Sequence, residues 1–232
     1  KTVDDSIRLA EAMVSIGEHV GRRTVALITD MSRPLGNAIG NSLEICEVCD
    51  TLKGHGPADL TAICIELAAN MLYLAGKGSI EECKRMAQGQ LHNGEAYERL
   101  KEMVAAQGGD IAVLDDNSKF QQAKVRHEVY AQQDGWFYAM DTEKCGIASV
   151  ELGAGREKKD DPIDYSAGII LKKKVGDKVQ KGEPLAVFYT SDSSRCAQAE
   201  RLFESAVTIR DGAPEEIPLI YARVTRDGVE RY

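Results

Sequence analysis

The sequence has 232 residues, of which 43% are hydrophobic and 28% charged, and its formal net charge is −8. This composition is typical of a globular protein with a hydrophobic core rather than of a disordered chain. The negative charge offers no basic field for a polyanion and no apolar run reaches the ~20 residues of a membrane span, so we expect a cytoplasmic protein that binds neither nucleic acid nor membrane.

The first elements along the chain predict a helix, a strand and a loop. Residues 2–20 carry apolar side chains at helical spacing. Residues 24–29 form a short β-branched and apolar run, as expected for a strand buried on both faces of a parallel sheet. Residues 31–41 contain Pro34 and two glycines, which indicate a loop with unusual backbone turns.

Helices are expected to dominate the following segment. Residues 42–52 read as a helix, and residues 59–75 are so apolar that they predict a core helix. Ser79 and Glu82 have the spacing of a capping box, which indicates the start of another helix. A further helix at residues 95–107 should stop at the glycine pair that follows.

Beyond residue 118 the apolar pattern changes to a period of two, which predicts strands. A helix is expected near residues 194–205, and the strands at residues 124–130, 135–141, 169–175 and 185–190. We therefore expect two domains. Residues 1–118 would be an α/β domain, part of a helix-flanked and mostly parallel sheet, and residues 119–232 an α+β domain with antiparallel strands.

Several residue groups could suggest chemistry, but a structural interpretation is favoured for each. The pair Cys46 and Cys49 lies inside a predicted helix without the second ligand pair of a zinc site, so we expect reduced, structural thiols. The four histidines lie far apart and none neighbours a clear nucleophile. The acidic pairs at 115–116 and 160–161 are typical of solvated turns, and the lysines at 172–174 of a solvated strand end.

The segment KVGDKVQKGEPL at residues 174–185 resembles the hammerhead turn of lipoyl- and biotinyl-carrier domains. Such a turn makes two tight glycine bends between short strands. Carrier domains also need an acceptor lysine with neighbours such as M-K-M or D-K-A, which no lysine here has. A carrier-like binding module therefore remains an alternative, beside a stand-alone structural or regulatory domain.

A more extensive resemblance runs through almost the whole chain in several blocks. In order they are ALITDMSRPLGNAIGNSLE at 26–44, DTLKGHGPADLT at 50–61, AAQGGD at 105–110, LGAGR at 152–156 and AGIILKKKVGDKVQKGEPLAVFYT at 167–190. Together these blocks resemble the pyrimidine-nucleoside and thymidine phosphorylases, in the same order. The resemblance implies that the chain is the C-terminal portion of such an enzyme.

The family resemblance implies reversible phosphorolysis of uridine, thymidine or deoxyuridine to a base and a (deoxy)ribose 1-phosphate. The transition state is oxocarbenium-like and demands a positioned phosphate and polar groups around the departing base. In the family the residues that meet these demands lie upstream of the point matching Lys1. We therefore expect the chain by itself to be inactive, with no catalytic or nucleoside-binding residue of its own.

The resemblance also implies part of a potassium site. In the family two backbone carbonyls and a carboxylate from this region hold the ion, and they map onto Leu35, Ala38 and Glu47. Oxygen ligands from a turning loop and a helix suit a hard cation. Because further ligands lie upstream, the ion is expected in the full-length enzyme, and this chain should hold no potassium. The family forms homodimers mainly through a helical domain that also lies upstream, so this chain should be monomeric or only weakly associated.

Overall fold

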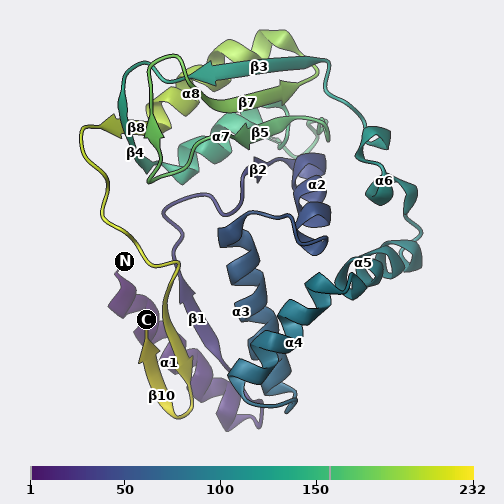
Figure 1. Cartoon of the computed structure of the whole chain (residues 1–232), viewed down its shortest axis with the longest axis vertical. Coiled ribbons are helices and arrows are strands. Elements are labelled where there is room, and N and C mark those ends of the chain that lie inside the picture. Colours follow the sequence, from purple (N-terminus) through teal and green to yellow (C-terminus); the bar gives the residue numbers. More distant parts are fainter. Residues whose placement is uncertain (1, 157) are drawn as a thin grey trace. The chain divides into compact units, whose positions relative to one another are not determined.

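The computed structural model describes residues 2–156 and 158–232 (Figure 1). The chain divides into two compact units. The first unit comprises Lys1–Met31, Ala58–Glu95 and Ile217–Tyr232, and the second comprises Ser32–Pro57 and Ala96–Glu216. These units combine segments from both sides of residue 118, so they group the chain differently from the expected domains at 1–118 and 119–232, and that domain assignment stays a prediction.

The first unit is built on a three-stranded sheet of order β1-β9-β10, with β1 at Ala26–Thr29, β9 at Ile220–Thr225 and β10 at Gly228–Arg231. Both pairings are antiparallel. Helix α1 (Val3–His19) covers one face of this sheet. Its buried side chains Ile7, Ala10 and Val14 form a core with two residues of β9, Ala222 and Val224.

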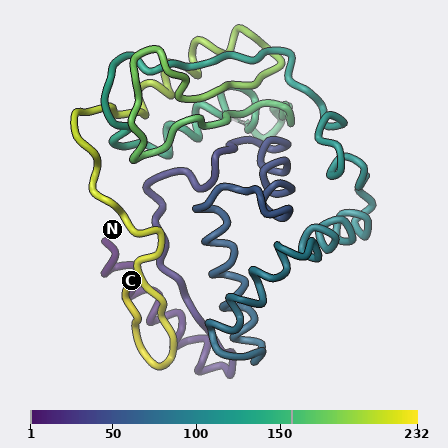
Figure 2. Tube along the Cα trace, viewed as in Figure 1, coloured from purple at the N-terminus to yellow at the C-terminus, as the bar shows by residue number. Residues whose placement is uncertain are grey.

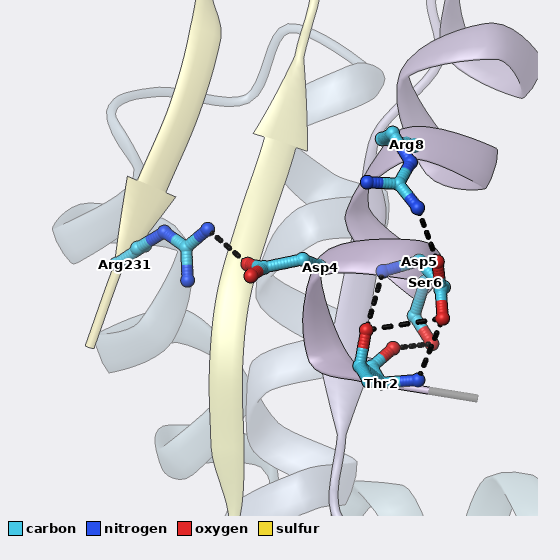
Figure 3. A network of polar contacts seen from close by, with 6 residues as sticks. All are labelled: Thr2, Asp4, Asp5, Ser6, Arg8 and Arg231. Carbon is cyan, nitrogen blue, oxygen red and sulfur yellow. Dashed lines mark hydrogen bonds and ion pairs between the residues drawn. The ribbon is translucent and has the colours of Figure 1, made fainter.

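Two sets of contacts fix the start of α1 (Figure 3). Thr2 and Asp5 form a capping box, in which each side chain accepts from the backbone N–H of the other residue. Asp4 accepts a hydrogen bond of 2.6 Å from Arg231 of β10. The N- and C-terminal segments therefore lie side by side in this unit, as the trace in Figure 2 shows.

Two helices complete the first unit, α3 (Ala58–Leu74) and α4 (Ile80–His92). The capping box predicted at Ser79 and Glu82 is confirmed at the start of α4. Helix α3 is not the uniform core helix that its sequence predicts, because Glu66 is buried and forms an ion pair of 2.9 Å with Lys84 of α4. This hydrogen-bonded pairing raises the pKa of Lys84.

The second unit holds two antiparallel sheets. The four-stranded sheet has the order β2-β5-β7-β3, with strands at Ala38–Ile39, Gly168–Leu171, Pro184–Thr190 and Val125–Tyr130. The three-stranded sheet has the order β6-β4-β8, with strands at Lys178–Val179, Gly135–Met140 and Val207–Arg210. The strands predicted beyond residue 118 are therefore confirmed.

Helices α7 (Thr142–Leu152) and α8 (Cys196–Ala206) pack with these sheets. Their shared core contains the fully buried Phe137, Phe188 and Phe203. The last two rings meet edge to face, with their centroids 5.5 Å apart. Such aromatic pairs add to the stabilisation that burial alone provides.

A smaller core in the second unit joins Cys49, Tyr97 and Leu114. These residues come from α2 (Asn41–Leu52), α5 (Glu95–Ala106) and α6 (Ala112–Asp115), respectively. Two short 3₁₀ helices, η1 at Asn117–Lys119 and η2 at Ser193–Arg195, make up the remaining helical segments described.

The parallel sheet expected around residues 24–29 is not found, since every strand pairing described is antiparallel. The residues of β1 are half-buried instead of enclosed on both faces. The reason is that the partner of β1 is the C-terminal hairpin β9–β10, an arrangement that no local pattern reveals. The described fold is thus a mixed one of helices and antiparallel sheets.

The carrier-like segment does make two tight glycine bends. In the first, Asp177 N–H donates to the carbonyl of Lys174, and Lys174 N–H donates to the Asp177 carboxylate. Gln180 and Glu183 repeat both hydrogen bonds in the second bend. The third residue of each bend is a glycine with positive φ, a backbone conformation that other residues rarely adopt.

Candidate functional site

The cation residues expected from the sequence belong to a loop and helix of the second unit. Gly36 lies in the loop with a φ of 71°, and Ala38 begins strand β2. Gly40 follows with a φ of 139°, and an added Cβ there would lie 2.5 Å from the carbonyl oxygen of Ala167. The backbone of this segment therefore depends on glycine both for conformation and for close packing.

Helix α2 supplies a carboxylate to this loop. Oε1 of Glu47 accepts hydrogen bonds from the backbone N–H groups of Asn37, at 2.8 Å, and Ala38, at 3.1 Å. Glu47 is half-buried and Ala38 is buried. Hydrogen bonds to an ionised carboxylate are stronger than neutral ones, so Glu47 holds this part of the loop against its own helix.

A lysine from the first glycine bend holds the loop from another direction. Nζ of Lys174 donates a hydrogen bond of 2.7 Å to the carbonyl of Gly36, which lies 138 residues away in sequence. The Leu171 N–H donates to the carbonyl of Asn37 at 2.8 Å. The loop is therefore fixed by a carboxylate at its N–H groups and by an ammonium group and a strand amide at its carbonyls.

These contacts correct the interpretation of the lysines at 172–174 as a solvated strand end. Lys172 is exposed, but Lys173 forms an ion pair of 2.7 Å with Glu183, and Lys174 is half-buried on the loop. Sequence reasoning missed Lys174 because its target is remote in the chain. The nearest signal was the position of the lysine directly before the valine-glycine-aspartate bend.

The structure brings two of the three predicted cation residues together. Glu47 and Ala38 are in contact, but the contact is made by the N–H group of Ala38 and not by its carbonyl, the group expected as a ligand. Leu35 is 40% exposed. A carboxylate beside a loop offers oxygen ligands of the kind that potassium requires, but the carbonyls of Gly36 and Asn37 already accept from Lys174 and Leu171. The ammonium group of Lys174 places a positive charge on the same loop, which opposes a second cation. Potassium binding through Leu35, Ala38 and Glu47 stays a prediction.

The cysteines have the environment of structural thiols. All six are free. Burial raises the pKa of both Cys46 and Cys49, whereas a reactive cysteine needs a lowered pKa. Burial raises the pKa of Cys145 to about 12. Within residues 2–156 and 158–232, no group of three or more His, Cys, Asp or Glu side chains could hold a metal ion.

The other polar candidates take part in local structure. His127 pairs with Glu200 across β3 and α8 at 3.0 Å. Asp115 accepts from Tyr97 and pairs with Lys101, an interaction that lowers the pKa of its carboxyl group. These partners indicate that His127 and Asp115 hold neighbouring elements together. A catalytic role as nucleophile or in proton transfer is not needed to explain them.

Two clefts, one in each unit, lack the excess of positive charge that would suit a phosphate. A cleft of about 490 Å³ in the second unit is lined by Arg195 together with three carboxylates, those of Glu151, Asp161 and Asp192. A cleft of about 290 Å³ in the first unit balances two arginines, at 23 and 226, against two carboxylates, at 18 and 227. Neither is an arginine- or lysine-dominated site of the kind that holds phosphoryl groups.

Comparison with known proteins identifies relatives over nearly the whole chain. A model of the "pyrimidine nucleoside phosphorylase C-terminal domain" matches residues 136–210. A pyrimidine-nucleoside phosphorylase of Geobacillus stearothermophilus is 44% identical over 228 residues, which cover 97% of this chain and 52% of that protein. The Bacillus subtilis protein of the same name is 42% identical over 227 residues, with the same coverage of each chain.

A third relative, the pyrimidine-nucleoside phosphorylase of Staphylococcus epidermidis, is 45% identical over 192 residues, or 82% of this chain and 44% of that protein. The chain thus spans about half the length of the curated relatives it matches. Among the helices of residues 2–156 and 158–232, none has the length and apolar character needed to cross a bilayer.

Proposed function

We propose that this chain is the C-terminal portion of a pyrimidine-nucleoside phosphorylase and works as part of an enzyme that cleaves pyrimidine nucleosides with phosphate. The reaction would transfer the pentosyl group from the base to phosphate. We place that reaction in cytoplasmic nucleoside salvage, with a pyrimidine nucleoside and phosphate as substrates.

One observation carries this proposal. The similarity to the relatives extends over 97% of the chain at 42% to 44% identity, rather than over an isolated motif. Similarity of this extent requires the same packing of helices and sheets in both proteins. The alternative of a lipoyl- or biotinyl-carrier module has no support in these comparisons. The two glycine bends, between β5 and β6 and between β6 and β7, resemble the turn of a carrier domain in shape. In our proposal they have no carrier activity.

The chain by itself should not catalyse the reaction. Its described clefts lack the concentration of positive charge that would position a phosphate against a sugar. The test compares two polypeptides, the 232-residue chain and the same chain preceded by the N-terminal half of the G. stearothermophilus relative. Only the joined polypeptide should release uracil or thymine from uridine or thymidine when phosphate is present.

Release of base by the 232-residue chain above a control without protein would refute the proposed inactivity. Failure of a folded joined polypeptide to release base from any pyrimidine nucleoside would count against the proposed activity. A joined polypeptide without added phosphate is the matched control, since phosphorolysis requires phosphate as the nucleophile.

In the full-length enzyme we propose that potassium binds beside Leu35, Ala38 and Glu47. The hydrogen bonds from the loop to Glu47 support this placement, because they keep the carboxylate against the loop that would supply the carbonyls. We further propose a homodimer for the full-length enzyme and a monomer for this chain. Light scattering at micromolar concentration should give the mass of one copy, and a tight dimer would contradict the second proposal.

A further inference from the structure

Helix α1 has two apolar faces, of which only one is buried. Ile7, Ala10 and Val14 pack on the sheet of the first unit. Roughly opposite, Leu9, Met13, Ile16 and Val20 are 63%, 59%, 66% and 70% exposed. The spacing of four and three residues places Leu9, Met13 and Ile16 in one row along the helix, and Val20 continues the row as the cap residue directly after His19. We call this row the α1 stripe.

Helix α3 repeats this arrangement on the other face of the same sheet. Because side chains alternate along a strand, Arg223 of β9 points away from α1, and its Nε donates to Asn70 of α3 at 2.8 Å. While Glu66 and Asn70 are buried, Leu67 and Met71 are 43% and 67% exposed, and Cys64 is exposed in line with them. We call the row of Cys64, Leu67 and Met71 the α3 stripe.

The buried face of α3 combines the apolar Ile63 and Ala69 with the polar Glu66 and Asn70, while the large apolar Leu67 and Met71 face outward. Stripes of apolar side chains at helical spacing are uncommon on soluble monomers and mark surfaces that another segment covers. The spacing of the α1 stripe is that of a seam between two helices, and Ala12, exposed within it, allows a close approach. An apolar helix is thus the segment that fits.

The relatives indicate what that segment is. They match 97% of this chain but only about half of their own length is matched, so a region of similar size accompanies these two units in each relative. The first unit offers two outward apolar rows on helices that enclose one sheet, with the edge of β1 opposite β9 available for further chain.

We propose that the α1 and α3 stripes are the docking surface for the N-terminal half of the phosphorylase polypeptide, with an apolar helix of that half lying along the α1 stripe. This inference rests on the proposed function, because the occupant is the half of the enzyme that lies outside the match between this chain and its relatives. Docking here would place the substrate-binding half against the first unit and would bury both rows.

Two methionines make the proposal testable without any activity measurement. Met13 lies in the α1 stripe and Met71 in the α3 stripe, while Met103 of α5 is 51% exposed outside both and Met140 is buried at 7%. Oxidation by hydrogen peroxide, followed by mass spectrometry of peptides, reports the exposure of each methionine. The samples are the 232-residue chain and the joined polypeptide that carries the N-terminal half of the G. stearothermophilus relative ahead of Lys1.

In the 232-residue chain Met13 and Met71 should oxidise about as fast as Met103, and in the joined polypeptide both should slow by about tenfold or more while Met103 is unchanged. Met140 should be slow in both samples. Equal rates for Met13 and Met71 in the two samples would overturn the proposal. Protection in the 232-residue chain that grows with its concentration would identify a second copy as the occupant and would also overturn it.

A matched pair of substitutions tests the helix contact itself. In the joined polypeptide Ile16→Glu should restore fast oxidation of Met13, whereas Ser15→Glu, which adds the same charge at a neighbouring exposed position off the stripe, should not. An equal effect of both, or of neither, would refute a seam along the stripe. Base release is assayed on the same samples. Protection without base release would refute only the proposed function, and base release without protection would refute only the docking surface.

Discussion

Removing the carboxylate of Glu47 should loosen the loop that α2 holds. In Glu47→Ala the N–H groups of Asn37 and Ala38 lose the oxygen that accepts from both at 2.8 and 3.1 Å. Ala38 is buried at 6%, so water cannot readily replace that partner, while Asn37 is half-buried and can be rehydrated. The damage should therefore be local and centred on the start of β2.

The magnitude follows from the two hydrogen bonds. A hydrogen bond to a charged group contributes about 1.5–3 kcal/mol, but partial rehydration of one donor reduces the sum, so we expect Glu47→Ala to cost about 2–3 kcal/mol. Glu47→Gln keeps an acceptor oxygen and loses only the charge, so its expected cost is about 1 kcal/mol. Asp50→Ala, at an exposed position of the same helix, is the control and should change stability by less than about 0.5 kcal/mol.

Urea unfolding can be followed through Trp136, the single tryptophan, which lies in β4 of the same unit as Glu47. Amide hydrogen exchange then localises the effect, because loosening should accelerate exchange at Asn37 and Ala38. Unchanged exchange at both amides in Glu47→Ala would refute the role of the carboxylate as the clamp of this loop.

The same variant tests the cation. Thermal unfolding of the 232-residue chain should be equal in potassium and in a large organic cation at the same ionic strength, because a ligand that binds the folded state would raise its stability. A potassium-specific increase that disappears in Glu47→Gln would show that the residues of this chain bind the ion by themselves, contrary to our expectation.

Three further outcomes follow from local geometry. Gly168→Ala should cost about 3 kcal/mol in urea unfolding, because a Cβ there would lie 2.3 Å from a carbonyl oxygen of β2 at a φ of 152°; a near-neutral result would contradict this packing. The hydrogen bond and charge of Arg231 lower the pKa of Asp4, so the resulting stability is present above the unfolded pKa of about 3.9 and is lost as pH falls through the lowered value. Asp4→Asn should therefore flatten the acid side of the stability profile measured by thermal unfolding, and an unaltered profile would argue against the pair. Because burial raises the pKa of Cys145 to about 12, a disulfide reagent at pH 8 should modify the exposed Cys64 first and Cys145 only on unfolding; fast modification of Cys145 in the native protein would refute its burial.

Local signals in the sequence were sufficient for most elements of the fold. The capping box at Ser79 and the glycines after residue 107 define the ends of α4 and α5, because caps act within one turn of a helix. The segments predicted as strands became β3, β4 and β7, although β7 is buried along most of its length instead of on alternate residues. These features depend on neighbours a few residues apart, which a sequence displays directly.

The parts that could not be predicted depend on partners far apart in the chain. The partner of β1 begins at Ile220, and the burial of Glu66 depends on Lys84 and on neighbouring elements rather than on the pattern of α3. Lys174 reaches Gly36 across 138 residues. For the candidate site, only resemblance to a family selected Glu47, since an isolated glutamate in a helix carries no spacing signal.

The sheet order β1-β9-β10 affects how the protein is made. A ribosome releases β1 well before its hydrogen-bonding partner β9, which lies in the final segment of the first unit, Ile217–Tyr232. During synthesis α1 would therefore lack Ala222 and Val224, on which it packs, until β9 has been translated. The residues of the second unit are complete sooner, at Glu216. Loss of Ile217–Tyr232 would thus remove the partner of β1 and the residues on which α1 packs, so β1 and α1 should be the first elements to unfold.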